Sequence, residues 1–365
     1  MMQPPFATTA EAVDAVLAFI ARDGCTDAGF DGLALRLHAT QYARNPAYRG
    51  FCQRRGATPR QVQGWRDIPA TPISAFKDLT LACEPPSPAD RVFMTSGTTR
   101  GAVRGRHHHP TLAVYDASML RNFATCFMRG RPRLRMGLLF PTEQALPNSS
   151  LAHYLALAVR EFGTVDSRWL LGPQGLDVDA AAAGLEEAER CGEPHALLGA
   201  TSGFVHLLDA LQQRGQSFRL PSGTRILDTG GTKGQSRELP PEAFYAALSA
   251  ALGVDRADCI NMYGMTELST QFYDDGNVSL PSVQSGPHWI RSRLVEPLSG
   301  REVPLGERGI LVHCDLANFN SVTTLLTEDV GHAVDGGFVL LGRAEGSQAK
   351  GCSLAVEEFL RASAA

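Results

Sequence analysis

The sequence predicts an α/β protein with a largely parallel sheet, followed by an antiparallel β region. Between residues 91 and 263, short apolar runs alternate with amphipathic stretches, which is the pattern of βα units. After residue 285 the helical patterns stop, and apolar runs joined by Gly and Pro turns follow. The length of 365 residues allows about two domains or one large one.

The first part of the chain is expected to be mostly helical. Residues 10–22 place apolar side chains at helical spacing, namely Val13, Val16, Leu17 and Ile20. More helix is expected through Tyr48, before the Pro-rich bend IPATPISAF.

The α/β part is expected from residue 91 onward. Apolar runs predict strands at residues 91–95, 136–140, 167–171, 195–199, 225–229 and 259–263. Amphipathic stretches predict helices at residues 149–162, 176–190, 202–214 and 240–252. The runs WIRSRLV, GILVHC and GFVLLG then predict antiparallel strands.

Composition and charge narrow the class of protein. The net charge of -4 argues against a protein that binds nucleic acid. The eight cysteines contain no Cys-x-x-Cys pair and are widely spaced, which indicates free thiols in a reducing compartment rather than zinc ligands. The N-terminus MMQPPFATT does not look like a signal peptide, and no apolar run approaches 18 residues. We expect a cytoplasmic protein without a membrane span.

The first candidate binding motif follows the strand expected at 91–95. It reads Thr95-Ser96-Gly97-Thr98-Thr99-Arg100-Gly101. A loop of Gly and small hydroxyl residues can surround a phosphate with backbone N–H groups, and a nearby Arg104 can add charge. Taken alone, an ordinary polar turn explains this loop equally well.

The second motif, YGMTE, follows the strand expected at 259–263. Ligands of open α/β sheets bind at the carboxyl ends of strands. Tyr263 can stack on a base, Thr266 can bond to a phosphate, and Glu267 can hold Mg²⁺. By itself, the motif is also compatible with a buried tyrosine and a solvated glutamate.

Two further motifs complete the set. In DTGGTK, Gly230 and Gly231 permit close backbone approach after a strand, although a simple turn would also need them. In the C-terminal part, the Asp329 carboxylate can accept ribose hydroxyls, and Arg343 can pair with a phosphate or ribose oxygen. A β-hairpin with a Gly turn is the alternative for that region.

In this order the motifs resemble those of the adenylate-forming superfamily, which includes acyl-CoA synthetases, peptide-synthetase adenylation domains and luciferases. TSGTTRG is similar to the phosphate loop of that family, DTGGTKG to its adenine-contacting segment, and YGMTE to its nucleotide and magnesium motif. TED and GFVLLGR look like its ribose-binding Asp and hinge Arg. The phosphate loop departs from the family pattern, because Arg104 stands in place of the usual lysine.

Within the superfamily, the length and the terminal KGCSLAVEEFL resemble the LuxE-type acyl-protein synthetases of bacterial bioluminescence. PATPISAFKD and PNSSLAH look like the same group. The resemblance implies that ATP activates a fatty or aryl carboxylic acid to acyl-AMP with release of pyrophosphate. A cysteine near the C-terminus, here Cys352, then takes the acyl group as a thioester. A partner reductase of the LuxC type receives it and makes an aldehyde.

The resemblance also implies an organisation of the chain and a role for each motif residue. We expect a helical lead-in at 1–90, an adenylation core at 91–342 made of βα-layered sheets plus a small antiparallel region, and a short tail at 343–365. That tail stands where the family has a lid domain with a catalytic lysine, so we expect a truncated lid. Cofactors are expected to be ATP and Mg²⁺.

The expected site residues fall into groups by role. Thr95, Ser96, Gly97, Thr98, Thr99 and Arg104 hold the phosphates. Gly230, Gly231, Tyr263 and Gly264 surround the adenine. Thr266 contacts the α-phosphate, Glu267 holds Mg²⁺, Asp329 binds the ribose and Arg343 steadies the adenylate. His153 gates the acyl pocket, Lys233 replaces the lid lysine, and Cys352 accepts the acyl group.

Two alternatives stay open at this point. In the first, the enzyme passes the acyl group to coenzyme A or a carrier protein, as phenylacetate-CoA ligases do. In the second, the chain is a nucleotide-binding scaffold for a reductase, without catalysis. The run His107-His108-His109 is not expected to hold a metal, because the side chains of consecutive residues diverge.

Overall fold

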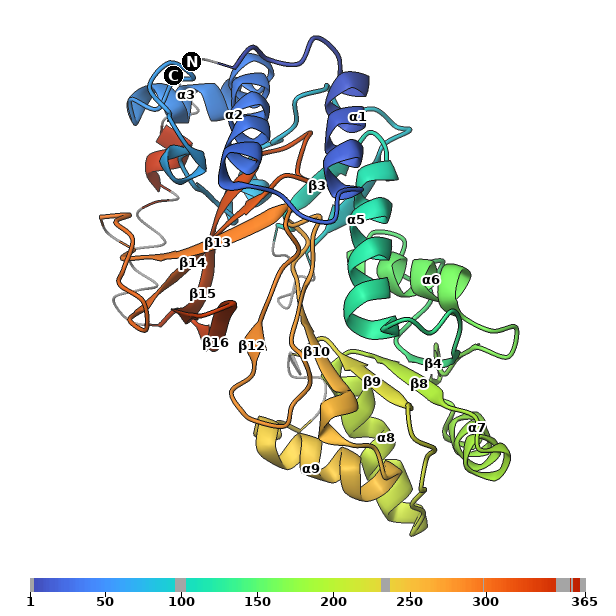
Figure 1. Ribbon diagram of the computed structural model, residues 1–365. Helices are drawn as coiled ribbons and strands as arrows, with labels where there is room; N and C mark the ends of the chain where they lie inside the picture. The colour runs from blue at the N-terminus through green and yellow to red at the C-terminus, as the bar shows by residue number, and fades with distance from the viewer. Residues whose placement is uncertain are drawn as a thin grey trace. The chain divides into compact units, whose positions relative to one another are not determined.

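The structure is a computed structural model that describes residues 3–95, 103–230, 237–297, 299–345, 355 and 357–361 (Figure 1). The chain forms two compact units. Unit 1 consists of Met1–Met119, Met265–Thr270 and Ser285–Ala365, and unit 2 of Leu120–Gly264 and Gln271–Gln284. In the described part of the chain, no helix is long and apolar enough to span a bilayer.

Unit 2 is built on the expected parallel sheet. Its strands lie in the order β11-β10-β9-β8-β4-β5, and all pairs are parallel except β10 with β11. The strands are β4 (Arg135–Leu139), β5 (Arg168–Trp169), β8 (His195–Gly199), β9 (Arg225–Asp228), β10 (Cys259–Tyr263) and β11 (Phe272–Tyr273). Shorter strands are β6 (Leu171–Gly172), β7 (Gly175–Leu176) and β12 (Val283–Gln284). The run expected as one strand at 167–171 is thus split between β5 and β6.

The helices of unit 2 begin and end close to where the sequence predicts them. They are α6 (Ser150–Phe162), α7 (Val178–Cys191), α8 (Thr201–Arg214) and α9 (Pro241–Leu252). The Ser149 and Asp177 side chains accept hydrogen bonds from backbone N–H groups in the first turns of α6 and α7. Helices α7, α8 and α9 each end at a glycine in the left-handed conformation, which stops the helix without strain.

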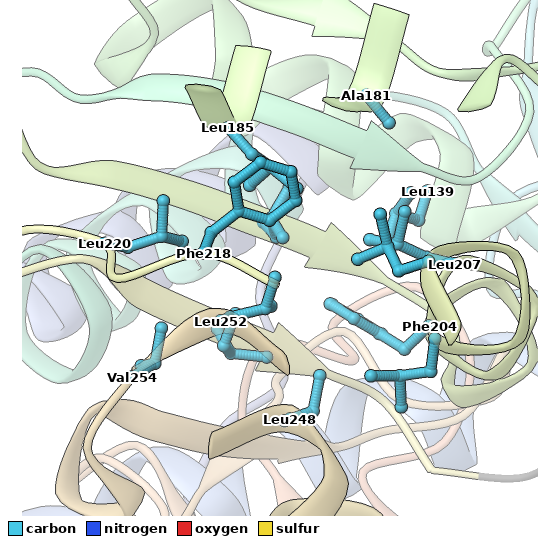
Figure 2. Close-up of a cluster of buried hydrophobic side chains, with 14 of the residues drawn as sticks. Leu139, Ala181, Leu185, Phe204, Leu207, Phe218, Leu220, Leu248, Leu252 and Val254 are labelled. Carbon is cyan, nitrogen blue, oxygen red and sulfur yellow. The ribbon is translucent and has the colours of Figure 1, made fainter. Parts of the chain in front are cut away.

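The core of unit 2 lies between the sheet and helices α7, α8 and α9. Leu139 from β4 belongs to one buried hydrophobic cluster with Leu185, Phe204 and Leu248 from these helices (Figure 2). The neighbouring Leu138 is equally buried, although its side chain points to the opposite face of the sheet. Both faces of the central strands are therefore covered, which explains why these strands read as continuous apolar runs.

Unit 1 contains the expected antiparallel region. Strands β13 (Ile290–Val295), β14 (Arg308–Asp315), β15 (Thr324–Val334) and β16 (Gly337–Arg343) pair antiparallel in sequence order, and β1 (Thr71–Pro72) runs parallel to β15. The sequence patterns do not predict β15, because its apolar alternation is interrupted by Thr327, Glu328 and Asp329.

Helices cover the remaining parts of unit 1. They are α1 (Thr9–Ile20), α2 (Asp27–Arg44), α3 (Pro46–Arg54) and α4 (Ala75–Asp78), with a 3₁₀ turn η1 (Trp65–Asp67). Helix α5 (Ala113–Phe123) starts in unit 1 and continues as a π-helical turn η2 (Ala124–Met128); unit 2 also has a 3₁₀ turn, η3 (Arg256–Asp258). Val16, Phe30 and Trp65 bury their side chains with Trp289 and Leu316 in one hydrophobic cluster.

The C-terminal helical residues 357–361 are anchored in unit 1. Phe359 is fully buried, and its ring lies 4.5 Å from that of Phe51 on α3. Glu358 forms an ion pair with Arg55. The end of the described chain is therefore docked by a buried aromatic pair and an ion pair.

One strand differs from its expected place. The run at 91–95 was expected to open the parallel α/β pattern, but β2 (Arg91–Met94) pairs antiparallel with β3 (Arg106–His109) in unit 1. The physical reason is the length of the connection. A parallel crossover needs a dozen or more residues, whereas residues 95–105 are enough only for a loop between antiparallel strands.

Candidate active site

Glu267 is a buried carboxylate in unit 1. It belongs to the segment Met265–Thr270 and is 5% exposed. Burial raises its pKa to about 7, while its own backbone N–H and the positive charges of Arg343 and Lys77 act in the opposite direction. A carboxylate held in this way gains from a cation that shares its site.

A second buried carboxylate holds this segment in place. Asp315, at the end of β14, accepts hydrogen bonds from the backbone N–H groups of Ser269 and Thr270, each at 2.9 Å. It also accepts from the Thr270 hydroxyl at 2.8 Å and from the Ala317 N–H at 3.0 Å. Burial raises the pKa of Asp315 to about 6, against the effect of these donors. The segment that carries Thr266 and Glu267 is thereby fastened to the antiparallel sheet.

The two ends of the expected phosphate loop meet beside Glu267. The Thr95 N–H donates to the Gly105 carbonyl at 3.0 Å, and the Gly105 N–H donates to Thr95 Oγ1 at 2.9 Å. A Cβ atom on Gly105 would lie 3.4 Å from Glu267 Oε1 and 3.2 Å from Thr95 Cγ2. Arg104 is exposed next to this closure. Residues 96–102, which include Ser96, Gly97, Thr98 and Thr99, lie outside the described residues.

Asp329 and Arg343 are register partners on β15 and β16 of unit 1. Arg343 donates to Asp329 Oδ1 at 3.1 Å and forms an ion pair with Glu328 at 3.2 Å. The pairing shifts register directly afterwards, between Val330 and Gly331. Bulges of this kind redirect side chains next to functional sites. Asp329 is buried, whereas the Arg343 side chain is 63% exposed.

In unit 2, Asp228 organises the start of the DTGG segment. Its carboxylate accepts hydrogen bonds from Tyr245 Oη at 2.7 Å, Asn261 Nδ2 at 2.9 Å, and both Thr201 Oγ1 and the Gly230 N–H at 3.1 Å. Burial raises the pKa of Asp228, and these donors lower it. Gly230 has φ +65°, a conformation that suits glycine. Gly231 and Lys233 lie outside the described residues.

The YGMTE motif divides between the two units. Tyr263 and Gly264 belong to unit 2, and Thr266 and Glu267 to unit 1. The Tyr263 side chain is 8% exposed, and its ring lies 5.8 Å from that of Phe272. Gly264 is exposed and Thr266 is half-buried.

His153, the expected gate of the acyl pocket, is on α6 of unit 2. It is 5% exposed, and its Nδ1 lies 2.8 Å from Glu143 Oε1. Its expected role stays a prediction.

The structure therefore brings one group of predicted residues together in unit 1: Thr95, Arg104, Thr266, Glu267, Asp329 and Arg343. Unit 2 carries Gly230, Tyr263, Gly264 and His153. Cys352 lies outside the described residues.

Sequence reasoning missed four residues that support the unit 1 group: Lys77, His107, Asp315 and Asn318. A signal existed for Asp315 and Asn318, because both are polar residues at the end of a strong apolar run. No sequence signal indicated which groups these two side chains would bond.

The chain is similar in sequence to a protein family and to a ligase. A family model described as "Acyl-protein synthetase, LuxE" matches residues 174–361. The long-chain-fatty-acid–luciferin-component ligase of Vibrio harveyi is 24% identical over 295 residues, which are 80% of this chain and 75% of that protein.

Solved structures share the fold. A 2-hydroxyisobutyryl-CoA ligase in an open conformation, in complex with 2-HIB-AMP and CoA, aligns with a TM-score of 0.62 at 17% identity, over 87% of this chain and 74% of the other. ATP-bound MatB from Rhodopseudomonas palustris aligns with a TM-score of 0.51 at 17% identity, over 69% and 47%. The α/β fold class expected from the sequence is confirmed.

Proposed function

Because the family match covers more than half of its residues, this chain belongs to the LuxE family of acyl-protein synthetases, and from that membership we propose a two-step reaction. In the first step, a carboxylate oxygen of a fatty or aryl acid attacks the α-phosphorus of ATP. The bond from that phosphorus to the bridging oxygen breaks, pyrophosphate leaves, and acyl-AMP forms. In the second step, a thiolate of the enzyme attacks the acyl carbonyl carbon, and AMP leaves. The product is a thioester.

The observation that carries this proposal is the cluster around Glu267 in unit 1. The predicted phosphate loop closes at Thr95 and Gly105, directly against the Glu267 carboxylate. Asp329 and Arg343 pair in the same unit, and the charge of Arg343 acts on Glu267. We assign Glu267 to the cation that accompanies ATP, Thr266 to the α-phosphate, Asp329 to the ribose and Arg343 to the adenylate.

The donor set around Glu267 fits Mg²⁺ bound together with a nucleotide. Among the described residues, no group of three His, Cys, Asp or Glu side chains is placed to hold a metal. Magnesium commonly takes one or two carboxylates and completes its shell with phosphate oxygens and water. Glu267 offers one such carboxylate, whose burial disfavours its charge in the absence of a cation. Bound there, Mg²⁺ would offset the charge of pyrophosphate.

Cys352 is the proposed acyl acceptor. The seven other cysteines are free thiols, and burial raises the pKa of Cys52, Cys83, Cys259 and Cys314 to about 12. Thiols of that kind are poor nucleophiles, because the thiolate is the reactive form. Ala355, which is helical, follows Cys352 by three residues in the sequence, and Phe359 is anchored in unit 1 by the Phe51 ring. We propose that a reductase of the LuxC type receives the acyl group from this thioester.

The test of the second step is intact-protein mass spectrometry after incubation with ATP, Mg²⁺ and a panel of fatty and aryl acids. We expect an acyl mass that hydroxylamine removes, on the wild type and on Cys191→Ala but not on Cys352→Ala. Cys191 is the matched control, because it is a free and exposed thiol. An unchanged adduct on Cys352→Ala would overturn the assignment of the acceptor. Product that forms only with coenzyme A or a carrier protein would make the enzyme a ligase for a free thiol.

The test of the first step is acid-dependent exchange of pyrophosphate into ATP. We expect Glu267→Gln to lose at least 100-fold in exchange rate, whereas Glu307→Gln, an exposed loop glutamate, keeps the wild-type rate. No exchange by the wild type with any acid of the panel would point to a nucleotide-binding scaffold instead.

A further inference from the structure

His107 has no role in the reaction as proposed so far, yet it touches the segment that carries the proposed catalytic groups. It lies on β3 of unit 1 and is 2% exposed. Its Nδ1 is 3.0 Å from the backbone oxygen of Thr266, and its Nε2 is 3.1 Å from Ser321 Oγ. The ring therefore bridges the YGMTE motif and the loop after β14.

The partners of His107 determine where its proton resides. A carbonyl oxygen carries no hydrogen, so the ring donates to Thr266 through an Nδ1–H group. In the neutral ring Nε2 is then an acceptor, and the Ser321 hydroxyl donates to it. Burial lowers the pKa of His107 to about 4, so the ring is neutral at physiological pH. One tautomer is selected.

Packing prevents the ring from turning away. The His109 ring lies 4.1 Å from the His107 ring, and Phe76 meets it edge-on at 5.6 Å. His107 and His109 are both buried, whereas His108 is half-buried on the other side of the strand. The alternation of β3 thus places His107 and His109 on one face of the strand and His108 on the other.

The peptide unit that His107 holds is the one that leads into Glu267. Its carbonyl accepts from His107, and its N–H, which belongs to Glu267, interacts with the Glu267 carboxylate. The next carbonyl, that of Glu267, accepts from Asn318 Nδ2 at 2.8 Å. Asn318 in turn accepts from Ser269 Oγ at 2.7 Å. Two consecutive carbonyls are therefore held from separate side chains, which restricts the direction of the Glu267 side chain.

We propose that His107 is a positioning residue for adenylation: its Nδ1–H holds the Thr266–Glu267 peptide so that the Glu267 carboxylate faces the cation bound with ATP, and Ser321 maintains the tautomer that can donate. This inference rests on the proposed function in so far as Glu267 acts on ATP. In this role the His107 ring touches neither the substrate nor the cation and acts through the Thr266–Glu267 peptide.

The test compares two amide replacements that differ in which ring nitrogen they imitate. Asn places its amide near the position of Nδ1 and can still donate to Thr266, whereas Gln reaches toward the position of Nε2 and Ser321. We expect His107→Asn to stay within about threefold of the wild-type kcat for pyrophosphate exchange. We expect His107→Gln and His107→Leu to lose about 30-fold in kcat and to need about tenfold more Mg²⁺ for half-maximal rate.

A purely structural role gives a different pattern. If rates in the Asn, Gln and Leu variants fall in proportion to their loss of unfolding free energy, or if Asn and Gln are equally impaired, His107 is not a positioning residue. Ser321→Ala, which keeps the Thr266 bond, is expected to lose less than fivefold, and a larger loss than in His107→Leu would also contradict the proposal.

A binding measurement separates this inference from the proposed function. ATP affinity is titrated calorimetrically with and without Mg²⁺. If the wild type shows no exchange with any acid, the proposed function fails, and His107 is judged on binding alone. A Mg²⁺-dependent loss of ATP affinity in His107→Gln that His107→Asn restores supports the positioning role. Equal affinities in all variants overturn it.

Discussion

Buried ionisable side chains are the residues whose chemistry depends most on their surroundings in this protein. His313 on β14 is fully buried, and its Nδ1 lies 2.8 Å from Ser292 Oγ. Burial lowers its pKa from 6.5 to about 3. The folded protein therefore keeps this ring neutral at pH values where the unfolded chain takes up a proton.

This difference makes His313 a source of acid sensitivity. Its folded pKa lies below its unfolded pKa, so the fold loses stability as the pH falls below about 6.5, until about pH 3. Between pH 7.5 and pH 5 the loss amounts to about 2 kcal/mol. We therefore compare the unfolding free energies of His313→Asn and wild type by urea titration at both pH values. As the pH falls from 7.5 to 5, we expect the difference between them to shift in favour of the variant by about 2 kcal/mol. Because the same difference is compared at two pH values, any packing cost of the substitution that does not depend on pH cancels. No shift of the difference would show that the ring is not buried neutral.

Lys77 is the second residue with a testable electrostatic role. It is exposed on α4, and its charge lowers the pKa of Glu267. The residue before it, Phe76, lies beside the closure of the phosphate loop: a Cβ added to Gly105 would be 3.5 Å from Phe76 Cβ. We expect Lys77→Met to raise the KM for ATP about tenfold, corresponding to about 1.4 kcal/mol. Arg60→Met, which removes another exposed positive charge, is the control. Equal KM values for Lys77→Met and wild type would exclude the role.

At the scale of elements, close packing of helix on strand depends on glycine at one position of α8. A Cβ on Gly203 would lie 2.4 Å from the backbone oxygen of Leu139 on β4. A backbone atom in the centre of a sheet cannot move away cheaply. In α2, by contrast, a Cβ on Gly32 would meet nothing within 4 Å. Close packing therefore requires glycine at position 203 but not at position 32.

A pair of identical substitutions tests this contrast. Gly203→Ala is expected to destabilise the protein by about 2 kcal/mol or more, because it forces an overlap in a packed core. Gly32→Ala is expected to be neutral or to stabilise by up to about 1 kcal/mol, since alanine favours a helix over glycine. Thermal and denaturant unfolding measure both. A Gly203→Ala protein as stable as Gly32→Ala would mean that α8 and β4 do not approach as closely as described.

At the scale of the whole molecule, the chain passes between the two units repeatedly, at residues 119–120, 264–265, 270–271 and 284–285. The short segment Met265–Thr270 belongs to unit 1, although the residues before and after it in the sequence belong to unit 2. The Asp315 carboxylate accepts three hydrogen bonds from this segment, two from the N–H groups of Ser269 and Thr270 and one from the Thr270 hydroxyl. A buried carboxylate of unit 1 therefore helps to hold the segment that carries Thr266 and Glu267.

Removing that carboxylate should affect both stability and activity. Asp315→Ala leaves the buried N–H groups of Ser269, Thr270 and Ala317 without this acceptor, and each costs about 1–3 kcal/mol. We expect a loss of about 4 kcal/mol in unfolding free energy, together with loss of pyrophosphate exchange. Asp335→Ala, at an exposed turn, controls for the loss of an aspartate. An Asp315→Ala enzyme with normal exchange would show that the segment keeps its place without these bonds.

Much of the architecture could be predicted because periodicity is local. The helices of unit 2 and five strands of its sheet follow directly from apolar spacing, and Gly192, Gly215 and Gly253 mark helix ends. β15 was missed, since its polar Thr327-Glu328-Asp329 run breaks the alternation. The assignment of residues 91–95 to the parallel α/β pattern was wrong, because strand pairing depends on the length of the connection and not on the apolar run itself.

The sequence alone therefore determined the α/β class, the order of the elements, the motifs and the family resemblance, since all of these are written in short stretches of neighbouring residues. Only the tertiary structure decided which side chains hold those motifs. His107 and Asp315 reach the segment Met265–Thr270 from strands far away in sequence, and the burial that sets the pKa of Glu267 comes from the packing around it. Hydrogen bonds and desolvation act over a few ångströms of space, whatever the separation along the chain.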